Sequence, residues 1–370
     1  MLLIGQWPYQ SKNLAKFLTY IWIFQYVSIL IPQFIKLIEV IDNIDHTIEC
    51  FGPIIYNLGV GIKFCNNIFN RKQKALFDEI QKDWNNITDE TEIILLSKYA
   101  SFAKFLNFGY NYMCYSTMCC YLFLPLSSFI MDIIKPLTDT RPKNLVIFVE
   151  FFVDEEKYYF YIMIHSYITT IFGVLAVVST DMFYTSCVQH ACGMLSILGR
   201  RLKMINKDTN IIRKFENDFY KELEDAVTQH NKIIKYCERI NKTYGDSFFF
   251  ILGLNMFAMS FTGALIIRKW GLYYDIIRNG MFVGSQLFHL LYYSIQGQHL
   301  IDQSLMISDC IYESGWCTIS LRMKKIMTIM IMRSLKPITV SAKVFIISLS
   351  NFTMVTKASV SYFTVLKSSS

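Results

Sequence analysis

Residues that could carry out chemistry are few and scattered in this chain of 370 residues. His299 and Asp302 have the types needed for an acid–base pair, but their spacing is loose and no nucleophile accompanies them. The cysteines include no CxxC pair, so no zinc site is expected. Glycine-rich phosphate loops and the HExxH and GxSxG motifs are also absent. The sequence therefore predicts no enzyme, no cofactor and no metal site.

The C-terminal stretch offers a different kind of candidate, a weakly polar face on an apolar helix. A long helix is predicted over residues 340–366. Five small, hydroxyl or apolar residues recur at i, i+3, i+4, i+7 and i+11: Ala358, Ser361, Tyr362, Val365 and Ser369. Such a face suits packing against other helices or the lining of a water-filled path. The spacing alone leaves both interpretations open.

Composition indicates the kind of protein that holds these residues. Hydrophobic residues make up 53% of the chain and charged residues only 18%, whereas about a quarter of a soluble domain is usually charged. No secretory signal is visible, because the apolar run at residues 1–4 is short and no basic segment precedes it. We expect an all-α membrane protein in which one helical bundle uses most of the length.

Seven segments are apolar over roughly the 20 residues that a bilayer core requires. They are residues 17–38, 52–69, 105–131, 158–178, 248–267, 276–295 and 340–366. The second is the weakest candidate, because it is short and contains Lys63, Asn66 and Asn67. In the fourth, His165 suits a helix–helix hydrogen bond or a ligand contact. Asp181, near the inner end of that segment, is expected to pair with a lysine rather than to relay protons.

Basic residues determine the predicted orientation. With a cytoplasmic N-terminus, most of the 36 lysines and arginines would lie on the cytoplasmic side, as the positive-inside rule requires. Seven crossings then place the C-terminus outside. The net charge of +7 belongs to the cytoplasmic loops, and a nucleic-acid-binding patch is the less economical explanation. We therefore predict no nucleic-acid partner.

The largest loop, residues 189–247, is polar but carries apolar residues at helical spacing. It is predicted to form cytoplasmic extensions of the fourth and fifth spans, packed against a helix around residues 304–335. A solvated hairpin without a partner is the alternative. The predicted organisation has five parts: spans one to four with the pocket region (1–190), an anchor of helical extensions (191–247), spans five and six (248–300), an anchor helix (301–339) and the last span (340–370).

The C-terminal third carries a family resemblance. The first group of residues is Tyr292-Tyr293-Ser294 with Gly297 and Ser304, then Tyr312-Glu313-Ser314-Gly315-Trp316. The second group is Lys336-Pro337, Ala342-Lys343, Phe345, Leu349, Phe352, Lys357 and Ser361-Tyr362-Phe363-Thr364-Val365-Leu366. In order and spacing this region resembles the insect odorant receptors, and the odorant-specific subunits rather than the co-receptor.

The resemblance implies an ion channel. Members of this family assemble as tetramers with an olfactory co-receptor in the plasma membrane and conduct cations when a small volatile molecule binds. Tyr362 and Val365 match pore-lining positions, and Val365 matches a hydrophobic gate that closes by dewetting. Ser361 and Ala358 share that helical face. Ser369 stands where the co-receptor type has a second apolar residue, which favours a heteromeric gate.

The resemblance also implies a ligand pocket and a subunit interface. The pocket should lie in the outer halves of spans two, three, four and six, among apolar and aromatic residues suited to a volatile ligand. The candidates are Tyr56, Met118, Leu122, Tyr161, His165, Phe282 and Gln286. Tyr312 and Trp316, four residues apart, are expected to form one aromatic face where subunits touch. Ordinary packing inside the bundle is the alternative for every one of these residues.

Two other receptor classes remain as alternatives. A gustatory receptor of the same superfamily would have the same architecture, but its usual ending contains a Gln-Phe pair that does not follow Ser361-Tyr362-Phe363 here. A metabotropic seven-helix receptor would place the N-terminus outside, against the distribution of basic residues.

Overall fold

The protein is almost entirely helical in the part of the chain that the computed structural model describes, which is residues 1–69, 72–135, 145, 147–205, 216–269, 271 and 273–368. The helices are α1 (Lys12–Glu39), α2 (Ile44–Phe69), α3 (Lys72–Asn86), α4 (Glu90–Ile134), α5 (Glu155–Met204), α6 (Glu216–Arg268), α7 (Tyr273–Tyr312), α8 (Leu321–Ser334) and α9 (Leu349–Ser368). Two 3-10 turns, η1 (Leu2–Ile4) and η2 (Trp316–Thr318), and a hairpin of β1 (Ser341–Ala342) and β2 (Phe345–Ile346) complete the described elements. The predicted all-helical class is thus confirmed.

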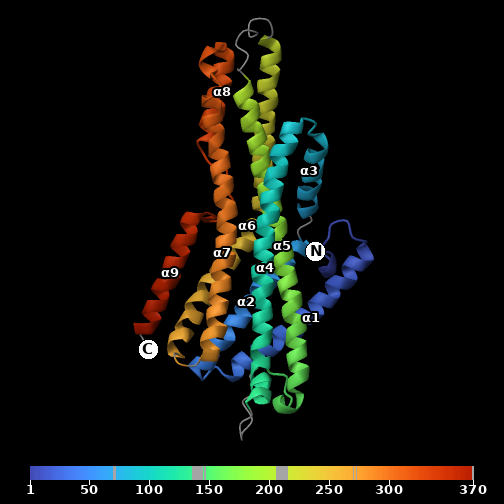
Figure 1. Ribbon diagram of the computed structural model, residues 1–370, viewed down its shortest axis with the longest axis vertical. Helices are drawn as coiled ribbons and strands as arrows, with labels where there is room; N and C mark the ends of the chain where they lie inside the picture. The colour runs from blue at the N-terminus through green and yellow to red at the C-terminus, as the bar shows by residue number, and fades with distance from the viewer. Residues whose placement is uncertain are drawn as a thin grey trace.

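The bundle is elongated and has two zones along its long axis (Figure 1). Helices α4 to α7 run through both zones; α5 has 50 residues and α6 has 53. At a rise of 1.5 Å per residue each is roughly 75 to 80 Å long, more than twice a bilayer core. In one zone α1, α2 and α9 join them, and in the other α3 and α8 do (Figure 1). The first zone holds the predicted spans and the second holds the polar extensions.

Local signals explain where the longest helices begin. Asp89 and Asp154 are the N-caps of α4 and α5, and their carboxylates accept hydrogen bonds from backbone N–H groups of the first turn. Glutamates follow both caps, where the helix dipole favours negative charge. Pro32 is tolerated inside α1 at a site where its own carbonyl accepts a hydrogen bond of 3.1 Å from the backbone N–H of Glu150. The chain between α4 and α5 is thereby held against α1.

Six of the seven predicted spans lie within α1, α2, α4, α5, α6 and α7. By length and composition, four described helical segments could cross a membrane: Lys12–Glu39, Ile44–Ile68, Glu155–Met204 and Phe219–Arg268. Helices α4, α7 and α9 occupy the other predicted spans.

The predicted start of the last helix was wrong. The helix begins at Leu349, whereas residues around 340–347 form the β1–β2 hairpin. Lys343 has a φ of 54° at the hairpin turn, a backbone conformation that no helix contains. Asn241 of α6 fixes the hairpin through both ends of its amide, donating to the Thr339 carbonyl at 2.9 Å and accepting from the Ser341 N–H at 2.8 Å. Apolar β-branched residues gave this segment the hydropathy of a span without its helical structure.

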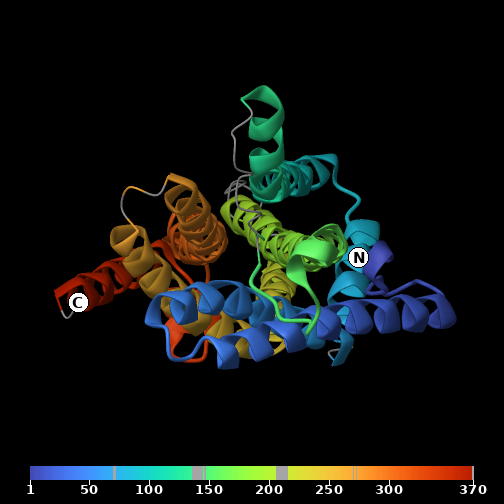
Figure 2. The same ribbon diagram turned by 90° about the horizontal axis from the view of Figure 1, so that it is seen from below.

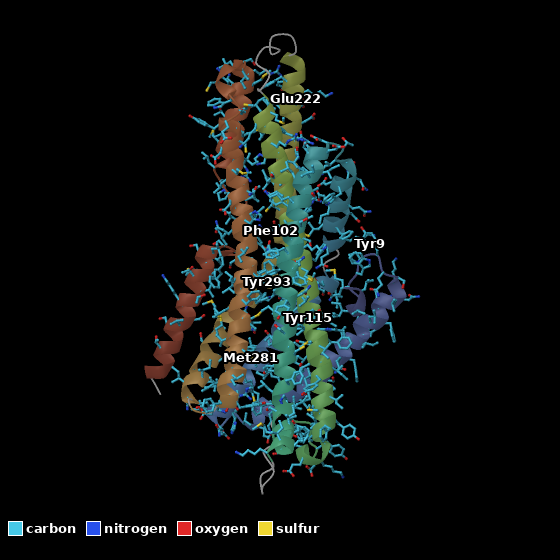
Figure 3. The ribbon with its side chains drawn as sticks, viewed as in Figure 1. Tyr9, Phe102, Tyr115, Glu222, Met281 and Tyr293 are labelled. Carbon is cyan, nitrogen blue, oxygen red and sulfur yellow. The ribbon has the colours of Figure 1, made fainter. Side chains whose placement is uncertain are left out.

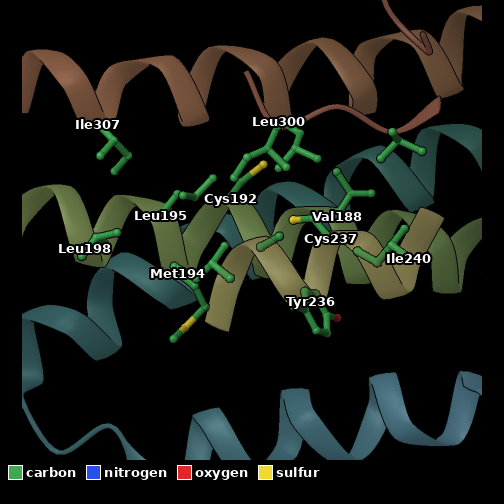
Figure 4. Close-up of a cluster of buried hydrophobic side chains, with 14 of the residues drawn as sticks. Val188, Cys192, Met194, Leu195, Leu198, Tyr236, Cys237, Ile240, Leu300 and Ile307 are labelled. Carbon is green, nitrogen blue, oxygen red and sulfur yellow. The ribbon is translucent and has the colours of Figure 1, made fainter. Parts of the chain in front are cut away.

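The polar extensions share one apolar core of buried side chains (Figure 4). Leu195 and Leu198 of α5, Cys237 and Ile240 of α6, and Ile307 of α7 are all buried in it, and α8 adds Met323, Met327 and Met330. The packing predicted between the extensions and the helix region around residues 304–335 is therefore confirmed. That region is not one helix, however, because α7 ends at Tyr312 and a turn at Gly315, with a φ of 71°, precedes η2.

Ion pairs attach α3 to this core. Asp83 of α3 accepts from His190 of α5 at 3.2 Å and from Lys232 of α6. Burial raises the pKa of Asp83, but the hydrogen bonds from His190 and Lys232 outweigh it and hold that pKa below the usual range. The carboxylate is therefore charged at neutral pH and links three helices.

Gly297 of α7 provides the first testable prediction, because the chain leading into α9 lies directly against it. A Cβ at this position would overlap the backbone carbonyl oxygen of Ile347. We expect Gly297→Ala to lower the free energy of unfolding by about 1–3 kcal/mol or more, the usual cost of overpacking, because a backbone atom cannot rotate away. The measurement is thermal unfolding of the purified protein. Gly284→Ala, on the same helix with no atom within 4 Å of the new Cβ, is the matched control and should not lower the midpoint. Equal effects of the two substitutions would contradict the prediction.

Candidate functional site

An apolar cavity of about 170 Å³ lies between α2, α4, α5, α6 and α7 in the first zone. Tyr56, Met118 and Phe282 line its walls, together with Ile147 from the segment before α5. A dry apolar cavity of about 150 Å³ is enough to hold benzene. The cavity can therefore take a compact apolar molecule about as large as one substituted ring.

The structure brings together four of the seven residues predicted for a pocket. Tyr56, Met118, Phe282 and Gln286 line the cavity, whereas Leu122, Tyr161 and His165 do not. Periodicity explains the difference on α4, where the lining residues follow one helical face that excludes Leu122: Tyr110, Cys114, Thr117, Met118 and Tyr121.

On α5 the two remaining candidates turn away from the cavity. Tyr161 is 73% exposed on the outer surface. The Nε2 of His165 lies 2.8 Å from the hydroxyl of Ser28 on α1, so this histidine joins two helices. The depth of these residues in the span was predictable from the sequence, but the helical face that meets the cavity depends on how α5 packs.

The cavity ends at a buried ionic cluster, and the sequence alone did not predict that its residues lie together. Asp181 of α5 is fully buried, and Lys63 of α2 donates to its two carboxylate oxygens at 2.8 and 2.9 Å. The Tyr110 hydroxyl of α4 donates to Oδ2 of Asp181 at 2.5 Å, and the Tyr293 hydroxyl of α7 donates to Oδ1. His289, also on α7, lies 3.1 Å from the carboxylate. The predicted pairing of Asp181 with a lysine is confirmed. Its partner is Lys63, one of the polar residues that made the second segment the weakest candidate for a membrane span.

Four helices thus converge on one carboxylate near the middle of the long axis, where Figure 3 labels Tyr293. A buried charge is tolerated only when it is paired and hydrogen-bonded. Lys63, Tyr110 and His289 line the cavity as well as contacting Asp181 or its partners. The cavity floor is therefore polar but internally satisfied. Among the described residues, no group of His, Cys, Asp and Glu side chains is arranged to hold a metal ion.

Four of the five predicted pore residues lie on α9, at one edge of the molecule (Figure 2). Val355 and Ser359 are buried on the side where α9 packs against α6 and α7. Ala358 is half-buried and Ser361 is exposed. Tyr362 and Val365 belong to α9 by their backbone, and their side chains are outside the described part. Ser369 is outside the described residues.

The aromatic face predicted for Tyr312 and Trp316 does not form on one helix. Tyr312 is the last residue of α7 and is 74% exposed, whereas Trp316 starts η2 after the turn at Gly315. The indole of Trp316 packs against the apolar core of the same chain. A spacing of four residues predicts one helical face, but the left-handed turn at Gly315 ends the helix between the two residues.

Comparison with known proteins places these features in a family. A family model described as "7tm Odorant receptor" matches residues 43–360. Odorant receptor 13a of Drosophila melanogaster is 24% identical over 220 residues, which cover 55% of this chain and 52% of that protein. Odorant receptor Or2 of Anopheles gambiae is 22% identical over 196 residues, half of each chain. The chain thus spans about half the length of these curated relatives.

Solved structures show the same fold. The insect olfactory receptor OR5 from Machilis hrabei, in complex with eugenol, superposes with a TM-score of 0.84 at 16% identity, covering 100% of this chain and 96% of that one. A second structure of the same Machilis hrabei receptor superposes with a TM-score of 0.81 at 16% identity, with 99% and 95% coverage.

The ionic cluster yields a prediction on stability. Lys63→Met leaves the Asp181 carboxylate buried without its cation, and removal of one partner of a buried pair typically costs about 3–5 kcal/mol. We expect a clear fall in the midpoint of thermal unfolding. The double variant with Asp181→Asn should recover part of it, because the buried charge is gone.

The control is Lys203→Met, which removes a lysine from the surface pair with Glu313, where the two side chains are 43% and 58% exposed. Such pairs contribute at most about 1 kcal/mol. The prediction fails if Lys203→Met is as destabilising as Lys63→Met, or if the double variant is less stable than Lys63→Met alone.

Proposed function

Because the chain belongs to the insect odorant receptor family, we propose that it is the odorant-binding subunit of a ligand-gated cation channel. It is a multi-pass membrane protein, and membership of a receptor family confirms the prediction that it is not an enzyme. The family match also favours the odorant branch over the gustatory alternative. The observation that carries the proposal is the apolar cavity between five helices.

The proposed ligand is a small, neutral, mostly apolar volatile molecule. Cavity walls of aromatic and aliphatic side chains remove such a molecule from water, which contributes roughly 25 cal/mol per Å² of apolar area. The similar receptor from Machilis hrabei was solved in complex with eugenol, itself a single-ring compound. Tyr56, Met118, Phe282 and Gln286 are the predicted residues that we retain for the site.

The proposed orientation has the N-terminus in the cytoplasm and the C-terminus outside the plasma membrane. In this arrangement α1, α2, α4, α5, α6, α7 and α9 cross the bilayer. The second zone, with its shared apolar core, then lies in the cytoplasm as an anchor domain. The excess of basic residues on that side supports this orientation. The exposed ring of Tyr312 makes the end of α7 a candidate contact with neighbouring subunits.

The proposed gate is formed by the last helices of four subunits around one axis. This chain supplies α9, and co-receptor subunits supply the remaining helices. Val365 would form the apolar constriction, and Tyr362, Ser361, Ala358 and Ser369 would line the path beside it. An apolar ring blocks ions by excluding water, and a small widening admits both. The position of α9 at an edge of the bundle supports this role, because the helix is accessible to neighbouring chains.

A substitution that fills the cavity tests the ligand site. Gly59 lines the cavity, and a Cβ added there would have no atom within 4 Å. We expect Gly59→Leu to occupy ligand space without disturbing the backbone and to abolish or reduce odorant-evoked current by about tenfold or more, the scale expected when ligand contacts are lost. Currents recorded with a co-receptor against an odorant panel provide the measurement.

Gly253→Leu on α6 is the control for this experiment, since its Cβ also has open space and the residue does not line the cavity. It should leave responses close to the wild type. Normal odorant responses in Gly59→Leu at normal surface expression would place the ligand elsewhere.

The gate is tested by Val365→Ala. A smaller side chain widens the proposed constriction and weakens dewetting, so we expect a larger basal current or altered ion selectivity when the variant is expressed with a co-receptor. Val360→Ala is the matched control, because Val360 is 56% exposed on α9 and is not among the proposed lining residues. Basal current and selectivity identical to those of the wild type would remove Val365 from the gate.

A further inference from the structure

Two carboxamide side chains in the cavity have polar groups that the proposed function does not use. Asn255 of α6 is 7% exposed and Gln286 of α7 is 8% exposed, and both line the cavity. Gln286 was predicted as a ligand contact from its depth, whereas nothing in the sequence distinguished Asn255 from other polar residues of its span.

The two amides lie at the same level of the bundle. Helix α6 ends at Arg268 and α7 begins at Tyr273, so the two helices run in opposite directions on either side of a short connection. Asn255 lies 13 residues before Arg268, and Gln286 lies 13 residues after Tyr273. Equal displacement from the connection brings them to one height, because both helices rise by the same distance per residue.

Neither side-chain amide makes a hydrogen bond with any other described part of the chain, in contrast to neighbouring polar groups of the cavity. The hydroxyls of Thr170 and Ser285 donate to the carbonyls of Ser166 and Phe282, each at 2.8 Å. Lys63 and His289 contact Asp181. Both amides reach the cavity, so two of them at one level can form hydrogen bonds with a bound molecule.

We propose that Asn255 and Gln286 together bind one oxygen atom of the ligand, so that this receptor selects oxygenated single-ring volatiles over hydrocarbons of the same shape. The inference rests on the proposed function in taking the cavity as the ligand site. The amide N–H groups donate to a carbonyl or phenol oxygen, and an amide oxygen accepts from a hydroxyl. The ligand is neutral, because the charges of the cavity floor already neutralise one another at Asp181.

Binding to the purified full chain in lipid nanodiscs tests the proposal without requiring a current. The probes are two matched pairs, phenol with toluene and acetophenone with isopropylbenzene. In each pair a methyl group of the hydrocarbon stands where the first member has its oxygen. A ligand that binds only the folded protein raises the unfolding midpoint by an amount set by its concentration and Kd. We expect the oxygenated member of each pair to bind about tenfold more tightly, the effect of one or two hydrogen bonds to buried groups that are otherwise unpaired.

The variants are Asn255→Leu and Gln286→Met, which keep the size of the side chain and remove the amide. Both should bring the affinity ratio within each pair close to one, without weakening the binding of the hydrocarbons. They should unfold close to the wild-type temperature when no ligand is present, because neither substitution removes a hydrogen bond with another described residue and an apolar side chain suits the cavity wall. Gln298→Met is the control, since the Gln298 amide donates to Asp302 at 2.8 Å outside the cavity. It should keep the wild-type ratio.

Three results overturn the inference: equal binding of both members of each pair to the wild type, a ratio that survives both substitutions, or no stabilisation by either oxygenated probe. Failure of the proposed function has a different signature. A chain that discriminates between the probes as expected, yet passes no ligand-evoked current with a co-receptor, is not an odorant-gated channel subunit, and the oxygen-binding amides still stand.

Discussion

The buried carboxylate of Asp181 is the constraint on which the arrangement of the bundle depends. A charge in this position requires a cation and hydrogen-bond donors at fixed distances, and they come from three other helices: Lys63 of α2, Tyr110 of α4, and Tyr293 and His289 of α7. Hydrophobic packing alone is non-directional and would tolerate small rotations of these helices. The carboxylate does not tolerate such rotations, because each would move a hydrogen-bond donor away from a charged group that water cannot reach. It therefore fixes which faces of α2, α4 and α7 point inward, and so which residues line the cavity beside it.

The same cluster separates two kinds of interior. On the side of the second zone lies the apolar core, where Leu195, Leu198 and Ile307 are fully buried. On the other side lies the cavity of about 170 Å³. A well-packed core resists deformation, whereas side chains around a void can move at lower cost. A ligand that fills the void would therefore act on the helices that line it, and α6 and α7 are among them. Those are the helices on which α9 packs, and Gly297 of α7 holds the start of the α9 segment at Ile347. The proposed ligand site and the proposed gate are thus connected through two shared helices.

The positions of the helices could be predicted from the sequence, but their facing surfaces could not. Hydropathy placed six spans inside six observed helices, because length and apolar composition are local properties. It failed at residues 340–347, where valines and isoleucines are equally apolar in a hairpin. The depth of Tyr56 and Phe282 along their spans was enough to place them at the cavity, while Tyr161 and His165 had the correct depth and the wrong face. The face depends on contacts across the bundle, such as that of Asp181 with Lys63, which joins residues 118 positions apart. Asn255 was missed for the same reason, since its significance appears only beside Gln286.

The geometry of α9 indicates how a helix can serve its own chain and an assembly together. Ser359 is buried against α6 and α7, and Ser361, two residues later, lies about 200° around the helix and is exposed. Ala358 lies about 100° from Ser359 and is half-buried. The proposed pore-lining face therefore adjoins the covered face and extends away from it. A helix held on one side in this way can present its other side to a central axis without losing its contacts with α6 and α7. A ligand that shifts those two helices would shift α9 as well. Even a small displacement of α9 would change the width of an apolar constriction.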